Sequence, residues 1–212
     1  MVNSGYRKLE VGWMEKTFLK IQDYINGMKT FSRVVYTERL NEMKRLYYSL
    51  NLSIDKDIEG ELDTEYIEFM QTNESLSLTW NISNLRNYIL HNHPDDYAVV
   101  SLSQIREDLG ETAYKRQIEA MEEEKVKLNT FPIIKQEPIY IMLLMPTRQY
   151  YILDGKHRFY EAHLKRRDIK CYYLNSDMLV PFLINEDQRR LYRFIKDFFA
   201  FCEEIGLFIT NI

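Results

Sequence analysis

One stretch of the sequence concentrates the side chains that catalysis or ligand binding requires. Residues 151–162 read Tyr-Ile-Leu-Asp-Gly-Lys-His-Arg-Phe-Tyr-Glu-Ala. The apolar start favours a strand, Asp154-Gly155 favours a tight turn, and residues 157–165 favour a helix. The free N–H groups and the positive dipole end of a helix attract anions, and glycine lets the backbone approach a ligand closely. The pattern therefore predicts a phosphate-binding turn.

The charged side chains of this turn suit the same chemistry. Lys156, His157 and Arg158 would add donors to a bound phosphate, and the carboxylate of Asp154 would hold Mg²⁺. The alternative is a strand–helix turn with incidental surface charges. In that case Arg158 is a structural ion-pair partner of Glu161 or of a carboxylate in the N-terminal region.

Basic residues extend beyond the turn in both directions. Residues 148–170 hold seven Lys or Arg and three Asp or Glu, whereas the 212-residue chain carries a net charge of −4. A local basic patch around a phosphate-binding turn is also the pattern of a nucleic-acid footprint, although a solvated face has the same composition. Binding of a DNA backbone thus stays open beside nucleotide binding.

The elements that must position the turn are predicted around it. Strands are expected at 97–102, 131–134, 139–144, 150–153 and 169–173, with a short helix capped by Ser103 and a charged helix over 112–127. The first ~95 residues show apolar stripes typical of helices, the third of them being Leu78, Ile82, Leu85 and Ile89. The acidic run 55–68 is expected to be a solvated loop and a first helical turn. A last helix is expected over 186–204.

The motif and its surroundings resemble a known family. Asp154-Gly155-Lys156-His157-Arg158 is similar to the Asp-Gly-x-His-Arg signature of the ParB/sulfiredoxin-like fold, and strands resembling that family's occur before and after it in order. The resemblance implies an α+β fold with a mixed-sheet core over 96–183. A helical N-terminal region (1–95) and a C-terminal helix (184–212) are expected to pack on this core, because 91–96 is not a flexible Gly/Ser/Pro-rich linker.

The resemblance also implies a function and a set of site residues. It implies a nucleotide-binding, phosphate-directed enzyme that uses Mg²⁺ with ATP or CTP for hydrolysis or phosphoryl transfer. The nucleotide-binding residues would be Gly155, Lys156, His157 and Arg158; the catalytic residues would be Asp154, His157 and, after the first strand, Glu107 or Glu111. Lys156 stands where sulfiredoxins have their catalytic cysteine, and the arginine-rich box of partition proteins is absent.

Two alternative functions stay open. One is a nucleic-acid-binding protein of a plasmid, phage or defence system, with or without nuclease activity. The other is a non-catalytic interaction module.

Composition bounds these functions. No run of about 18 apolar residues occurs, which excludes a membrane-spanning helix and predicts no membrane partner. Cys171 and Cys202 are too few for a disulfide framework, and no secretory leader is visible, so a cytoplasmic protein is expected.

Overall fold

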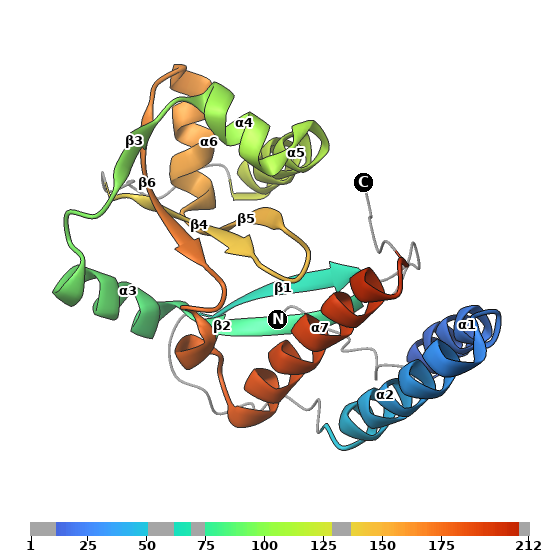
Figure 1. Ribbon diagram of the computed structural model, residues 1–212. Helices are drawn as coiled ribbons and strands as arrows, with labels where there is room; N and C mark the ends of the chain where they lie inside the picture. Colours follow the sequence, from blue (N-terminus) through green and yellow to red (C-terminus); the bar gives the residue numbers. More distant parts are fainter. Residues whose placement is uncertain (1–11, 51–61, 69–74, 129–136, 208–212) are drawn as a thin grey trace.

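The computed structural model describes residues 12–50, 62–68, 75–128 and 137–207. Within these ranges the fold is α+β, with seven α-helices, a four-stranded mixed sheet and a two-stranded hairpin (Figure 1). The helices are α1 (Gly12–Asn26), α2 (Thr30–Tyr48), α3 (Ile82–Asn92), α4 (Leu102–Leu109), α5 (Glu111–Leu128), α6 (Lys156–Lys165) and α7 (Glu186–Glu204), with a short 3₁₀ turn η1 (Val180–Phe182). The strands are β1 (Leu62–Glu68), β2 (Ser75–Asn81), β3 (Ala98–Val100), β4 (Ile139–Leu144), β5 (Gln149–Asp154) and β6 (Ile169–Asn175).

The main sheet has the strand order β3-β6-β4-β5. The central pair β4 and β6 is parallel, and each edge strand is antiparallel to its neighbour. Successive side chains of a strand point to opposite faces, so a strand that is covered on both sides is apolar throughout. Strand β4 is such a strand: Ile139 and Ile141 contribute to one buried cluster, and Tyr140 and Met142 contribute to the other.

Helices α4, α5 and α6 cover the first face of the sheet (Figure 1). The apolar side of α5 is the one expected for the charged helix over 112–127, because Tyr114, Ile118 and Met121 are buried there. Phe159 of α6 packs on Tyr114 with ring centroids 5.2 Å apart. This layer fixes α6, and with it the turn that precedes α6.

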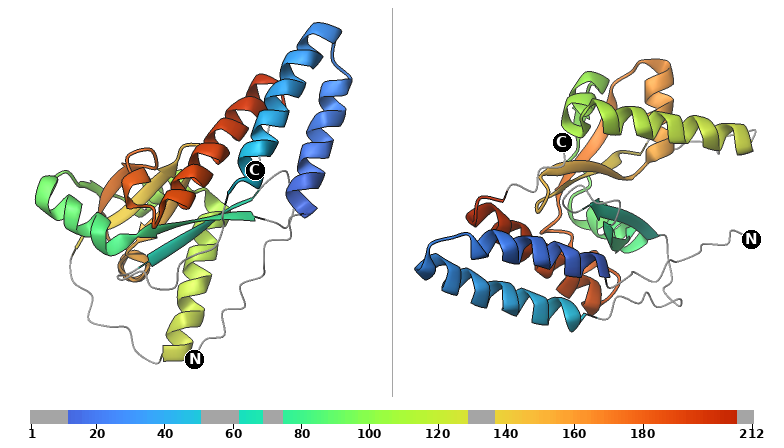
Figure 2. Two further views of the ribbon diagram at one scale, coloured as in Figure 1. Left: turned by 90° about the horizontal axis from the view of Figure 1, so that it is seen from below. Right: turned by 90° about the vertical axis from the view of Figure 1, so that its right-hand side faces the viewer.

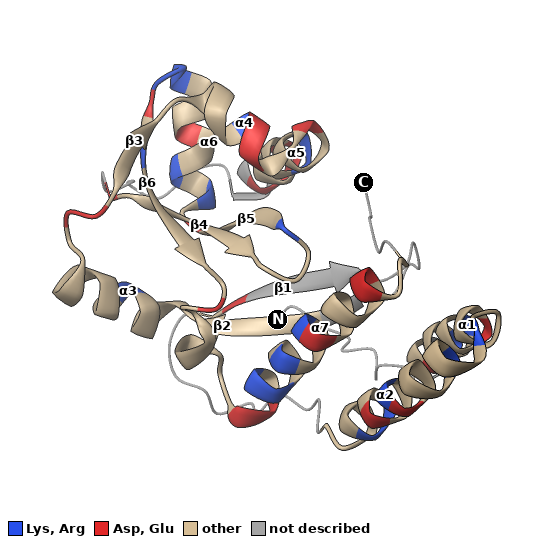
Figure 3. Ribbon diagram, viewed as in Figure 1, with Lys and Arg blue, Asp and Glu red and all other residues tan. Residues whose placement is uncertain are grey.

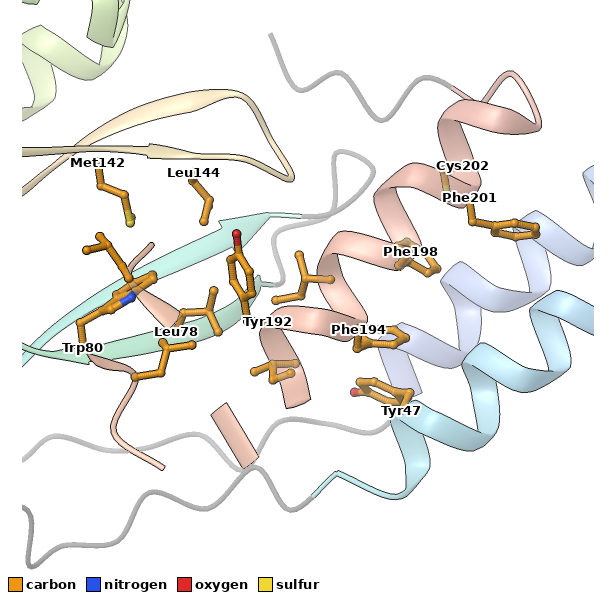
Figure 4. Close-up of a cluster of buried hydrophobic side chains, with 14 of the residues drawn as sticks. Tyr47, Leu78, Trp80, Met142, Leu144, Tyr192, Phe194, Phe198, Phe201 and Cys202 are labelled. Carbon is orange, nitrogen blue, oxygen red and sulfur yellow. The ribbon is translucent and has the colours of Figure 1, made fainter. Parts of the chain in front are cut away.

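The second face is covered by α3, by the β1–β2 hairpin and by α7. Helices α1 and α2 reach the core through α7, as Figure 4 shows for Tyr47 and Phe194, whose ring centroids lie 5.4 Å apart. Phe18 of α1 packs edge-on against Phe198 of α7 at 6.0 Å. Helices α1 and α2 therefore pack on α7, and α7 links them to the buried cluster on this face of the sheet.

The prediction of a wholly helical N-terminal region is wrong, because residues 62–68 and 75–81 pair as an antiparallel hairpin. Leu78 belongs to strand β2 and not to the helix that follows. It is buried together with Trp80, which lies two positions on and therefore on the same face of the strand. Asn81 then caps α3 by accepting a hydrogen bond from the Asn84 N–H. Leu78 precedes Ile82 by four positions, and that spacing imitates a continuous helical stripe.

Smaller differences concern caps and undescribed segments. Ser101, not Ser103, caps α4, because its hydroxyl accepts the hydrogen bond from the Gln104 N–H. The expected loop at 55–61 and the strand expected at 131–134 lie outside the described residues. In the described part of the chain, every helix is too short or too polar to cross a bilayer.

Candidate functional site

The turn between β5 and α6 is built as the sequence predicts: Asp154 is the last residue of β5, and α6 begins at Lys156. Gly155 adopts the left-handed conformation, with φ of 91°. A Cβ at this position would lie 2.7 Å from Cγ2 of Ile139 and 2.9 Å from Nε of Arg158, so no larger residue fits without movement. The carbonyl of Gly155 accepts the hydrogen bond from the Phe159 N–H at 2.9 Å, which starts the helix.

Asp154 forms the centre of the site. Its Oδ2 accepts hydrogen bonds from Nη2 of Arg86 at 2.8 Å and from Nη2 of Arg158 at 3.1 Å. The side chains of Asp154 and Arg158 are only 10% and 13% exposed. Arg86 reaches the turn from α3, and nothing in the sequence marked it as a site residue.

Each basic residue after the turn meets a carboxylate from another element. Lys156 pairs with Asp63 of β1 at 3.3 Å, and Nη1 of Arg158 donates to Glu137 at 3.1 Å. Nε2 of His157 lies 3.1 Å from Oε1 of Glu124 on α5. These three carboxylates thus contact the basic side chains that the sequence assigns to a phosphate. With Asp154 and Arg86 included, the site contains as many acidic as basic side chains.

The acidic partners differ in how firmly they are held. Asp154 is nearly buried and accepts hydrogen bonds from two guanidinium groups, whereas Glu137 is 45% exposed. An exposed ion pair contributes little free energy, so Glu137 can leave Arg158 at small cost. Asp154 cannot do so without removing the carboxylate that Arg86 and Arg158 share.

Tyrosine side chains continue the site along the second face of the sheet. Tyr140 is paired with Asp154 across the β4–β5 ladder, and its ring lies 5.2 Å from that of Tyr172. Burial is the main cause that raises the pKa of Tyr140 to about 12; Tyr172 and Asp154 contribute to this rise, and Arg86 and Arg158 oppose it. This phenol therefore stays protonated at neutral pH and offers a donor, not a base.

The remaining predicted residues lie apart from this cluster. Glu111, at the start of α5, pairs with Arg106 and Lys115, and Glu107 is exposed on α4. In the described ranges, no hydrogen bond or ion pair joins either glutamate to residues 154–158. The structure brings together Asp154, Gly155, Lys156, His157 and Arg158, and it adds Arg86, Asp63, Glu124 and Glu137.

A magnesium ion bound directly by the protein does not fit this arrangement. Oδ2 of Asp154 already accepts hydrogen bonds from two guanidinium groups, and their positive charges would repel a magnesium ion at this oxygen. Among the described side chains, no group of three His, Cys, Asp or Glu has the spacing of a metal site. We therefore assign Asp154 to the positioning of Arg86 and Arg158.

The basic stretch 148–170 is also largely neutralised. Arg148 pairs with Glu203, and both Lys165 and Arg167 pair with Glu161. Figure 3 shows acidic and basic segments intermingled around β5 and α6. The structure thus offers no continuous basic face along this stretch.

Comparisons with known proteins add no identification. No protein-family model, no curated protein and no solved structure matches this chain. The resemblance to the ParB/sulfiredoxin-like fold stays a prediction, and the function must be argued from the site alone.

Proposed function

We propose that this protein binds the phosphate groups of a nucleotide at the N-terminus of α6 and acts on them by hydrolysis or phosphoryl transfer. One observation carries the proposal: Arg86, Lys156 and Arg158 converge from two helices on a turn whose backbone amides open α6. Cationic side chains that are partly buried and held in a fixed orientation bind a polyanion more strongly than the same side chains in water.

Binding would proceed by exchange of anions. The phosphate would displace Glu137, which is 45% exposed, from Nη1 of Arg158. It would also displace Asp63 from Lys156, whose Nζ lies 3.3 Å from Oδ1 of that aspartate. Asp154 would stay in place and keep both guanidinium groups aimed at the ligand. Arg158 would then bind phosphate with one nitrogen and Asp154 with the other.

His157 is the proton-transfer group of the proposed reaction. Oε1 of Glu124 lies 3.1 Å from its Nε2, and a carboxylate at that distance stabilises the imidazolium that forms when the ring accepts a proton. His157 would take the proton of the attacking water or hydroxyl group. Lys156 and Arg158 would neutralise the charge that develops on the phosphoryl oxygens.

Calorimetric titration tests the binding step. ATP, CTP and a short DNA duplex are each titrated, with and without Mg²⁺, into wild type and Arg158→Ala. We expect wild type to bind a nucleotide and Arg158→Ala to bind it about tenfold more weakly, because a charge-assisted hydrogen bond is lost. Lys156→Ala should show a smaller loss, since an ammonium is less directional than a guanidinium. Arg116→Ala, an exposed arginine of α5, is the matched control.

The catalytic step has its own readout. His157→Gln should lower release of inorganic phosphate while leaving nucleotide affinity within about twofold of wild type. If wild type binds no nucleotide at millimolar concentration, the proposal fails for these ligands. The alternative function, a non-catalytic interaction module, would then have more support. If Arg158→Ala loses thermal stability but keeps its response to nucleotide, Arg158 is a structural ion-pair partner.

A DNA-binding function has less support. The cations of residues 148–170 are mostly paired with Glu203, Glu161, Asp63 and Asp154, as described above. Binding of the duplex with a steep dependence on salt would nevertheless favour it over nucleotide binding.

A further inference from the structure

The start of α2, next to the turn that joins it to α1, carries an exposed apolar surface. Phe31, Val34 and Val35 are 83%, 52% and 45% exposed, although large apolar side chains are usually covered. Residues three and four positions apart on a helix are neighbours, so the three side chains lie on one side of the first turns of α2. Figure 2 shows the turn at one extremity of the molecule, beyond the end of α7. We name residues 28–35 the α1–α2 tip.

Positive charge surrounds this apolar surface. Lys29 and Arg33 are exposed and form no ion pair within the described residues, and no acidic residue occurs in the first turn of α2. Lys20 adds a cation on α1, and Asp23 on α1 and Glu38 on α2 are opposing charges nearby in the sequence. A chain with net charge −4 therefore places a locally basic, apolar tip at one end.

The extent of the surface argues against a second copy as its occupant. Beyond Val35, the exposed positions of α2 are mainly polar, including Glu38, Glu42 and Arg45. The buried side of the helix is already used within the core by Leu40 and Met43. A stable dimer buries on the order of 1,600 Å² in total, far more than three side chains supply.

We propose that the α1–α2 tip docks on an anionic phospholipid surface. Phe31 would enter the boundary between headgroups and acyl chains, with Val34 and Val35 beside it. Lys29 and Arg33 would lie at the level of the lipid phosphates. Basic residues around a small apolar wedge are the combination that gives reversible binding at the surface of an anionic bilayer. The contact is peripheral and involves no membrane-spanning segment.

Vesicle sedimentation with the full chain tests this inference. One set of vesicles is phosphatidylcholine alone, and the other contains equal parts of phosphatidylcholine and phosphatidylglycerol. We expect wild type to sediment with the anionic vesicles only, and less so as salt is raised. Phe31→Ser should lower the partition coefficient about tenfold, from the lost burial of one aromatic side chain. Arg33→Glu should lower it by a similar factor and abolish most of the salt dependence.

Matched variants elsewhere control for general effects. Leu90→Ser removes an apolar side chain of α3 that is 51% exposed, and Arg116→Glu reverses an exposed charge on α5; both should bind like wild type. Absence of wild-type binding, or binding that Phe31→Ser leaves unchanged, would overturn the inference. It would also be overturned by light scattering that shows a dimer which Phe31→Ser dissociates, because a second copy would then cover the tip.

Discussion

Gly155 permits the backbone to pass from β5 into α6 where no side chain fits. Gly155→Ala should lower the free energy of unfolding by about 3 kcal/mol, from the left-handed backbone and the clash with Ile139 together. Gly206→Ala is the matched control, since φ is also positive there (79°) but the nearest atom would lie at 3.6 Å. It should cost only about 1 kcal/mol. Urea denaturation measures both variants, and equal losses would contradict the close packing at Gly155.

Asp154 compensates two arginines at once. Asp154→Asn should therefore lower the free energy of unfolding by about 3 kcal/mol, because it leaves Arg86 and Arg158 without their shared anion. Added inorganic phosphate should raise the thermal midpoint of this variant more than that of wild type, since an external anion takes over the vacated role. Asp168→Asn, at an exposed aspartate, should behave like wild type. A variant that is destabilised but indifferent to phosphate would argue that the two arginines bind no external anion.

Sequence reasoning locates part of this site and misses the rest for a physical reason. Asp154, Gly155 and the basic residues after them are consecutive, so local turn and helix rules suffice to place them. Arg86 and Glu137 reach the turn only through the tertiary fold, and no local pattern distinguishes them from other surface charges. Asp63 was assigned to a solvated acidic run, whereas it pairs with Lys156.

At the scale of elements, the long amphipathic helices and the apolar strands β4 and β5 are predicted well, because their periodicity is strong. The β1–β2 hairpin is not predicted. Its acidic first strand has the composition of a solvated loop, and the apolar spacing that begins at Leu78 is typical of a helix. The pairing of β6 with β4, and not with β5, also depends on packing across the whole sheet. No single segment contains that information.

Asp177 ties the segment after β6 to α7 and makes this contact sensitive to acid. Burial raises its pKa, but the hydrogen bonds from Lys196 and Tyr192 outweigh burial and hold the pKa below the ordinary value of 3.8. A depressed pKa stabilises the fold above that value, and the stabilisation is lost as the pH falls through the folded-state pKa. Asp177→Asn should therefore cost about 0.5–1 kcal/mol at pH 7, since the pair with Lys196 is partly exposed.

The difference between Asp177→Asn and wild type should vanish once the pH falls below the lowered pKa of Asp177, which denaturant titrations across the acid range can measure. A constant difference at all pH values would show that the lost contact is not electrostatic.

At the scale of the whole molecule, the β1–β2 hairpin and α3 cover apolar side chains of the main sheet that we expect to be exposed in a fragment beginning at residue 96. Leu78 and Trp80 are fully buried against the face of the sheet that carries Tyr140 and Met142. A fragment that begins at residue 96 should thus expose this face and fail to unfold cooperatively in a thermal scan followed by circular dichroism. A fragment that keeps the thermal midpoint of the full chain would show that the N-terminal region is an independent unit.

The packing of α1 and α2 on α7 also sets the order of events during synthesis. Arg39 and Glu204 form an ion pair although they stand 165 positions apart. When α1 and α2 leave the ribosome, the aromatic side chains of α7 that will cover Phe18 and Tyr47 have not yet been made. The two helices can pair with each other but keep an uncovered apolar stripe until α7 follows. Contacts this distant slow folding and lengthen exposure to aggregation, so nascent chains stalled before α7 are the form most in need of a chaperone.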